Sequence, residues 1–242
     1  IIMFKENFVI KGKLVCETGL HIGGSNDNID IGGTDNVIIR DVVSDLPFIP
    51  GSSLKGKLRS LFELNDKESA QSVRKNEGGP ATDGDSKAAK IFGVSADNNK
   101  ALDFPTRLIV RDAFPTEESI ELWSKQEDIV RGAELKYENN LNRITSEATP
   151  RNIERIPKGS AFAFEFIFSV YEKDEDNLMG VFEAMRLLED NYLGGNGSRG
   201  FGKVKFTNIS ITKRGQDYYK KDMDEEVIIE NADISEAVKS IN

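Results

Sequence analysis

The stretch AFAFEFIFSVY, residues 161–171, constrains the fold of this chain more than any other segment. Phe162, Phe164, Phe166, Phe168 and Val170 occupy every second position. Because successive side chains of a strand point to opposite faces, all five fall on one face. The stretch is therefore predicted to be a β-strand with one strongly apolar face.

Three further stretches are predicted to be strands and two to be helices. Residues 8–16, 106–114 and 203–211 have the composition and spacing of strands. Apolar residues recur at helical spacing over 54–62 and 178–192. The order strand, helix, strand, strand, helix, strand (βαββαβ) predicts an α+β, ferredoxin-like fold, which RRM-like RNA-recognition modules share. Function is expected at its open sheet face and its glycine loops.

The chain is predicted to form a single domain over residues 1–214, followed by an acidic tail, 215–242. At 242 residues and 38% apolar content it can bury a core. Residues about 65–104 are charged and rich in Gly, Ser and Asp, with a short helical patch around AAKIFG, and are interpreted as an insertion that is partly mobile. Residues 134–158 are polar and are predicted to be weakly structured.

The net charge of −9 argues against a nucleic-acid partner until its distribution is considered. The tail holds eight acidic and three basic residues, whereas residues 191–214 hold five basic residues and no acidic one. An acidic chain can thus present one basic face. No apolar run has the length of a membrane span, and the N-terminal segment lacks the features of a signal peptide. We expect a cytoplasmic protein with no membrane partner.

A glycine-rich segment, LGGNGSRGFGKVKF (residues 193–206), follows the second predicted helix. Gly194, Gly195 and Gly197 can adopt backbone angles closed to other residues, so their N–H groups can face an anion. The alternative is a helix end followed by a hairpin. Five glycines interleaved with Arg199 and Lys203 favour a phosphate contact.

A second basic segment, GSSLKGKLR (residues 51–59), begins the first predicted helix. Ser52 or Ser53 is predicted to cap that helix, and Lys55, Lys57 and Arg59 add positive charge. Free N–H groups and the helix dipole attract phosphate. An ordinary capped helix with a solvated basic face explains the segment equally well.

The loop HIGGSNDNIDIGGTDNV, residues 21–37, is both flexible and acidic. Its aspartates Asp27, Asp30 and Asp35 are possible Mg²⁺ ligands, although turn-forming residues are the simpler explanation. His21 is the one histidine, which excludes a paired-histidine ribonuclease and a three-histidine zinc site. A packing role, an RNA contact and a general base all stay open for it.

Five stretches together resemble one protein family: ETGLHIGGS, LPFIPGSSLKGKLR, RDAF, KYENNLNRITSEATPRNIERIPKGSAFAFEF and DNYLGGNGSRGFGKVKF. They are similar to the repeated backbone subunit of type III CRISPR effector complexes in the RAMP superfamily, most of all that of the Csm (type III-A) complex. The resemblance covers about residues 8–206. It implies a RAMP domain with a β-hairpin "thumb" over about residues 134–158.

The resemblance also implies an activity, a cofactor and partners. Copies of such subunits stack along CRISPR RNA beside other effector subunits, and each copy cuts complementary target RNA where its thumb splays a nucleotide. Asp35 matches the catalytic aspartate and would hold Mg²⁺ or another divalent cation. The residues expected against RNA are His21, Ser52, Ser53, Lys55, Lys57, Arg59, Arg143, Arg151, Gly194, Gly195, Gly197, Ser198, Arg199 and Lys203.

Two other functions compete with a metal-dependent endoribonuclease. One is a catalytically silent RNA-binding scaffold, in which Asp35 is only a turn residue. The other is a metal-independent ribonuclease that processes CRISPR RNA with His21 as its base.

Overall fold

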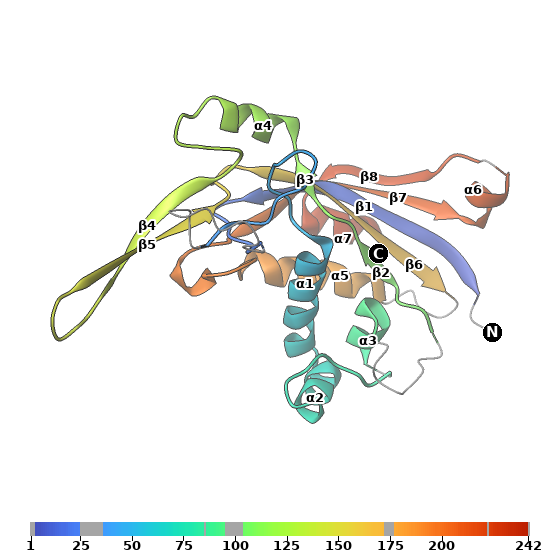
Figure 1. The fold of residues 1–242 in the computed structure, drawn as a ribbon. Helices are drawn as coiled ribbons and strands as arrows, with labels where there is room; N and C mark the ends of the chain where they lie inside the picture. The colour runs from blue at the N-terminus through green and yellow to red at the C-terminus, as the bar shows by residue number, and fades with distance from the viewer. Residues whose placement is uncertain are drawn as a thin grey trace.

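The computed structural model describes residues 3–24, 36–84, 86–94, 104–171, 177–221 and 223–241. Its main sheet is antiparallel and has the strand order β2-β6-β1-β7-β8, with the two-residue strand β3 also paired to β6 (Figure 1). The strands are β1 (Phe4–Cys16), β2 (Leu108–Val110), β3 (Phe114–Pro115), β6 (Ala161–Tyr171), β7 (Val204–Gly215) and β8 (Glu226–Ala232).

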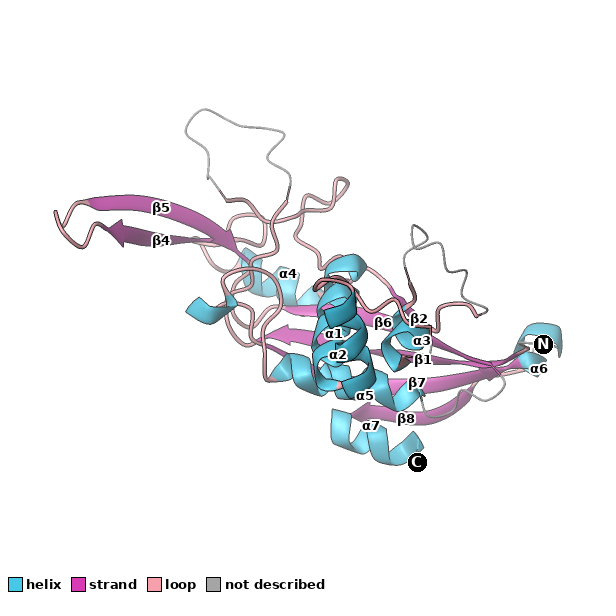
Figure 2. Ribbon diagram, turned by 90° about the horizontal axis from the view of Figure 1, so that it is seen from below, coloured by secondary structure: helices cyan, strands magenta, loops and turns pink. Residues whose placement is uncertain are grey.

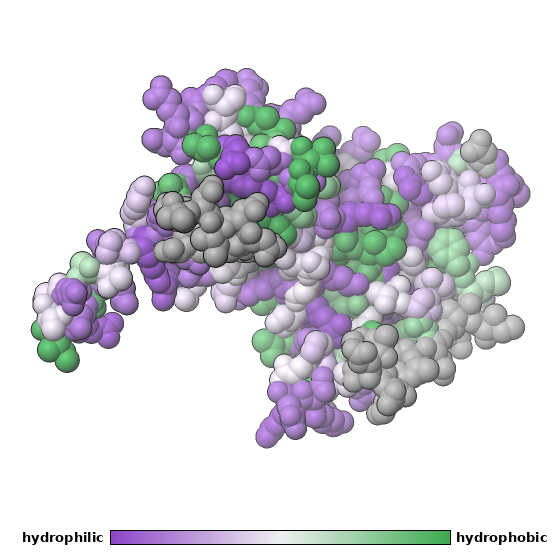
Figure 3. Space-filling view, viewed as in Figure 1, coloured by the Kyte–Doolittle hydropathy of each residue, from purple (hydrophilic) through white to green (hydrophobic). Residues whose placement is uncertain are grey.

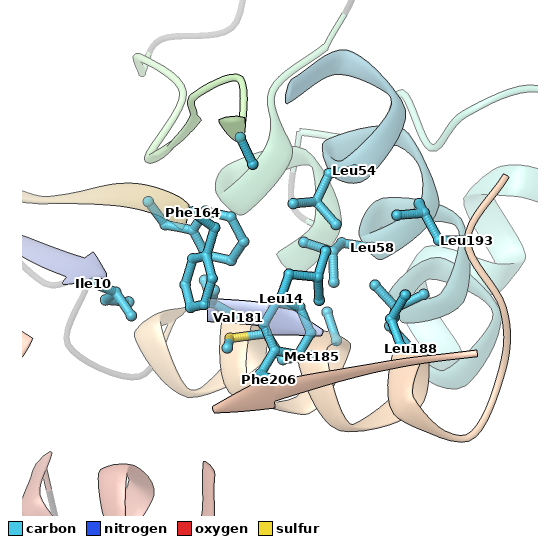
Figure 4. Close-up of a cluster of buried hydrophobic side chains, with 14 of the residues drawn as sticks. Ile10, Leu14, Leu54, Leu58, Phe164, Val181, Met185, Leu188, Leu193 and Phe206 are labelled. Carbon is cyan, nitrogen blue, oxygen red and sulfur yellow. The ribbon is translucent and has the colours of Figure 1, made fainter. Parts of the chain in front are cut away.

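The helices α1 (Gly51–Asn65) and α5 (Asn177–Glu189) cover one face of this sheet (Figure 2). The core lies between the two layers, where Leu58 of α1 and Met185 of α5 face Phe164 and Phe206 of the sheet (Figure 4). All five alternating residues of β6 are at most 2% exposed. Truncating one such phenylalanine to alanine typically costs about 3–5 kcal/mol. The predicted α+β, ferredoxin-like core is confirmed.

The predicted strand over 106–114 is interrupted. Between β2 and β3, Ala113 leaves β6 and exchanges backbone hydrogen bonds with Ile49, both 2.9 Å long. Asp112 then turns its carboxylate to the N–H of Gly51, at 2.7 Å. The interruption therefore places a negative charge at the beginning of α1, where the helix dipole favours it.

The two segments assigned outside the core contribute to it. The 65–104 segment contains α2 (Lys67–Lys75) and α3 (Lys87–Phe92), and Ala81 together with Ala88 and Ile91 of α3 is fully buried. In the acidic segment, β8 extends the sheet after α6 (Gln216–Lys221), and Ala237 of α7 (Ile234–Ile241) is fully buried. None of the helices described is long and apolar enough to cross a membrane.

A β-hairpin of β4 (Glu134–Leu141) and β5 (Ala148–Arg155) extends away from the body of the molecule (Figures 1 and 2). Helix α4 (Glu117–Ser124) precedes it. The expectation of weak structure in this range is wrong, because all eight residues of each strand pair across the hairpin. Its far end carries two exposed apolar side chains, Leu141 and Ile144, which are 60% and 95% exposed, among polar ones (Figure 3).

Candidate nucleic-acid interface

The glycine-rich segment folds into a compact loop against His21. Gly194 has a φ of +73°, and a Cβ at this position would lie 2.2 Å from the carbonyl oxygen of His21. Gly195 donates its N–H to the same oxygen at 2.8 Å, and Gly202 donates to the carbonyl of Gly19 at 2.9 Å. Gly200 closes the short 3₁₀ turn Gly197–Arg199 by donating to Gly197. Three of the five N–H groups are therefore already used, which makes the loop a rigid support more than an open anion nest.

This support presents Ser198 and Arg199, both exposed, next to the hairpin. A groove of about 510 Å³ lies between them, lined by Glu138, Asn139, Asn140, Arg151 and Arg199. The structure thus brings together two of the cations that the sequence assigned to RNA binding, from segments almost fifty residues apart. Arg143, at the hairpin turn, is also exposed but does not line the groove.

Ion pairs hold the inner face of the hairpin in place. Arg151 contacts Glu138 at 2.7 Å and Lys136 contacts it at 3.1 Å. These two hydrogen bonds, Arg151 first, lower the pKa of Glu138, so its carboxylate stays charged. In the part of the chain that the structure describes, the Nε of Arg151 is buried without a hydrogen-bond partner. That Nε is a spare donor beside the groove.

The root of the hairpin, where β4 begins and β5 ends, packs onto the glycine loop through Phe201. Lys136 Nζ lies 4.4 Å and the Arg155 guanidinium 5.1 Å from the centre of its ring. Arg155 also pairs with Glu134 at 2.5 Å across the two strands. Sequence reasoning did not assign these residues, although the complementary charges of Glu134 and Arg155 at the two ends of the predicted thumb were a usable signal.

His21 is held by the hairpin. Its Nδ1 lies 2.7 Å from the carbonyl oxygen of Glu154. Because a carbonyl can only accept, Nδ1 carries a hydrogen in this contact and Nε2 of the neutral ring is an acceptor. A methyl group at Gly23 would lie 3.7 Å from Nε2. In this tautomer Nε2 can accept a hydrogen bond, for instance from a ribose hydroxyl.

Asp35, Asp30 and Asp27 lie outside the described residues, but both ends of their loop are described. Gly24 donates to the carbonyl of Val37 at 3.1 Å, so the two ends lie side by side. Asn36 is bridged to Ile153 of β5, and its carbonyl accepts the N–H of Glu154 at 3.0 Å. The residue that follows Asp35 is thus bound to the root of the hairpin.

The two acids that follow this loop, Asp41 and Asp45, are engaged within the protein. The Oδ2 of Asp41 accepts hydrogen bonds from the N–H and the Oγ of Ser44 and from the N–H of Val43. The bond from the Ser44 N–H does most to lower the pKa of Asp41. Asp45 pairs with Arg131 at 2.6 Å. Among the described residues no three His, Cys, Asp or Glu side chains gather in a metal-binding group. Mg²⁺ needs only one or two protein carboxylates when water and phosphate supply the rest.

The basic residues of α1 are largely engaged within the protein. Neither Ser52 nor Ser53 caps the helix, because Pro50 is the N-cap residue and Asp112 binds the first N–H. Lys55 donates to the carbonyl of Leu108 at 2.9 Å, and burial lowers its pKa.

The two remaining cations of α1 also have partners. Lys57 lies 3.8 Å from the centre of the Tyr192 ring. Arg59 donates to Glu63 at 2.6 Å and to the carbonyl of Ala81 at 2.8 Å, which ties the 65–104 segment to α1. Glu63, four residues after Arg59, was the signal for this internal ion pair.

Lys203 and Arg199 differ in their partners, which gives a testable contrast in RNA affinity. Lys203 forms a 2.8 Å ion pair with Glu17, which raises the pKa of Lys203 and lowers that of Glu17. We expect Arg199→Ala to reduce the salt dependence of single-stranded RNA binding by about 0.7 in log K against log salt, the value for one phosphate contact. Lys203→Ala should change it less, because its charge is already neutralised. Titrations at several salt concentrations measure the slopes of both variants and of the parent, and an Arg199→Ala slope equal to that of the parent would remove Arg199 from the interface.

Known proteins are similar to this chain over most of its length. The family model of the RAMP superfamily matches residues 13–205. A protein of Methanothermobacter thermautotrophicus named "CRISPR system Cms endoribonuclease Csm3" is 53% identical over 90% of each chain, and one of that name from Methanocaldococcus jannaschii is 41% identical over 91% of each. A solved structure described as a Csm3-Csm4 subcomplex of the type III-A CRISPR-Cas interference complex has a TM-score of 0.64 at 30% identity, covering 99% of this chain and 96% of that one.

Proposed function

This chain belongs to the RAMP superfamily and, within it, to the Csm3 family, and from that premise we propose that it is a CRISPR RNA-binding backbone subunit that cuts complementary target RNA. Its partners would be CRISPR RNA, target RNA, further copies of itself and other type III effector subunits. Cutting would be endonucleolytic, at regular intervals, and dependent on a divalent cation.

The observation that supports this proposal best is the attachment of the aspartate loop to the hairpin. Asn36, next to Asp35, is bound to Glu154 of β5, and His21 is bound to the same residue. Residues of the same hairpin line the groove between Arg151 and Arg199. The hairpin therefore lines the groove that would hold RNA and also binds the loop that contains Asp35.

The apolar and the basic residues of this region would make different contacts with RNA. Leu141 and Ile144, exposed at the end of the hairpin, are suited to contact bases, while Arg151 and Arg199 would contact phosphates. Phosphate contacts carry no sequence information, so base pairing with the guide would select the target.

Cleavage of RNA demands little chemistry from the protein if the displaced nucleotide is held with its 2′-hydroxyl in line with the phosphorus. Asp35 would orient that hydroxyl or hold the cation. Mg²⁺, when bound, would neutralise the negative charge that develops on the phosphate. His21 would position the RNA by accepting a hydrogen bond at Nε2.

An assembled complex carrying a defined guide tests the proposal. We expect it to cut a complementary RNA into a ladder of regularly spaced products, and EDTA should abolish the ladder without releasing the target. A silent scaffold would bind the target and produce no ladder. Cutting that persists in EDTA and is lost in His21→Ala would indicate the metal-independent ribonuclease instead.

A further inference from the structure

Arg40 contacts oxygen atoms of three residues, Asp45, Arg131 and Glu154, although it belongs to none of the segments assigned to RNA. Its Nη1 donates to the carbonyl of Asp45 at 3.2 Å and to the carbonyl of Arg131. Its Nη2 lies 3.5 Å from Oε2 of Glu154. The side chain is only 15% exposed, so these contacts are better protected from water than those of an ordinary surface ion pair.

Two of these partners are the roots of the hairpin strands. Arg131 belongs to a tight turn, bridged from Val130 to Ala133, that leads directly into β4. This turn has little freedom, because Gly132 has a φ of +75° and a Cβ there would lie 2.7 Å from Pro47. Glu154 belongs to β5. Arg40 therefore holds both strands of the hairpin where they leave the body.

Glu154 also connects Arg40 to the loop that carries Asp35. The Glu154 oxygen that faces Arg40 also accepts the N–H of Ile38 at 3.1 Å. Two residues earlier, the Asn36 carbonyl accepts the N–H of Glu154. Arg40 itself follows this stretch in the chain. The exit of the loop and the hairpin root are thus joined through one arginine and one glutamate.

We propose that Arg40 is a positioning residue for target-RNA cleavage, which fixes the exit of the Asp35 loop relative to the hairpin. The inference rests on the proposed function, because the hairpin would place the scissile nucleotide and the loop would place the acid. Only an arginine can serve all three acceptors, since its planar guanidinium carries five donors in a fixed fork. A displacement of about 1 Å between acid and phosphate can reduce the rate by about 100-fold.

The test compares Arg40→Met, Arg40→Lys and Arg131→Met in the assembled complex with a guide and a complementary RNA. Arg131→Met is the matched control, because it removes an exposed ion pair to Asp45 from the same turn. The measurements are target affinity in EDTA, the single-turnover cleavage rate per bound target, and the nucleotide position of each cut.

We expect Arg40→Met to lower the rate per bound target by about 10- to 100-fold and to spread the cuts over neighbouring positions, with target affinity within about 3-fold of the parent. Arg40→Lys should recover only part of the rate, because an ammonium cannot reach all three acceptors. Arg131→Met should cut like the parent. If Arg40→Met assembles poorly, the rate per bound target in Arg40→Lys decides the question.

A purely structural role for Arg40 would reduce the yield of complex and leave the rate per bound target and the cut positions unchanged, and that result would overturn the inference. In that case the parent complex still cuts, so the proposed function stands. A parent complex that never cuts the target would overturn both.

Discussion

Replacing Asp35 by alanine abolishes cutting of the complementary RNA and leaves target binding intact: this is the largest effect that we expect. The acid would supply the cation or orient the attacking hydroxyl, and the loss of such a contribution typically costs 100-fold or more, about 3 kcal/mol in the barrier. The measurement is single-turnover cleavage of labelled target in saturating guide-loaded complex, with affinity determined separately in EDTA.

The neighbouring acid provides the control for this experiment. Asp30→Ala removes a carboxylate from the same loop, five residues before Asp35. We expect it to change the net charge by the same amount while cutting continues. Undiminished cutting by Asp35→Ala would contradict the assignment, and its loss in Asp30→Ala alone would move the acid to position 30.

The second large effect is expected from Gly194→Ala, which should destabilise the glycine loop and weaken RNA binding. The φ of +73° costs a non-glycine residue about 1–3 kcal/mol. The new methyl group would also meet the His21 carbonyl oxygen at 2.2 Å, and backbone atoms must move to relieve that contact. His21 would lose its place against Glu154, and Arg199 its place beside the groove.

Gly200→Ala separates backbone strain from the steric clash. Gly200 lies in the same loop with a φ of +87°, but a Cβ there has no neighbour within 4 Å. We expect a lower melting temperature in both variants, and a large loss of RNA affinity in Gly194→Ala alone. Thermal unfolding and RNA titration measure the two effects. Equal RNA affinity in the two variants would show that the contact with His21 does not organise the interface.

The core could be predicted from sequence because its signal is local. The period-two phenylalanines of β6 and the helical spacing in α1 and α5 each lie within one segment. The hairpin could not, since its stability depends on cross-strand pairs such as Glu134 with Arg155 and Arg151 with Glu138. Only the resemblance to a known family placed a hairpin there.

The candidate nucleic-acid interface could be predicted only in part, because it too depends on contacts between distant segments. The glycine-rich segment was recognised, yet two of its glycine N–H groups bind carbonyls that are distant in sequence, those of His21 and Gly19. The cations of α1 looked available because most of their partners, namely Leu108, Tyr192 and Ala81, lie outside the helix. Sequence spacing reveals charge along an element, whereas the tertiary fold determines which charges stay free for a ligand.

The most direct test of the central claim is a structure of the assembled complex with a target RNA whose 2′-hydroxyls at the cut sites are replaced by hydrogen. We predict that the Asp35 carboxylate lies within about 5 Å of a displaced phosphate, since one Mg²⁺ with ligand distances of about 2.1 Å can bridge the two. An Asp35 side chain too distant from every displaced linkage to share a cation with it would contradict the account.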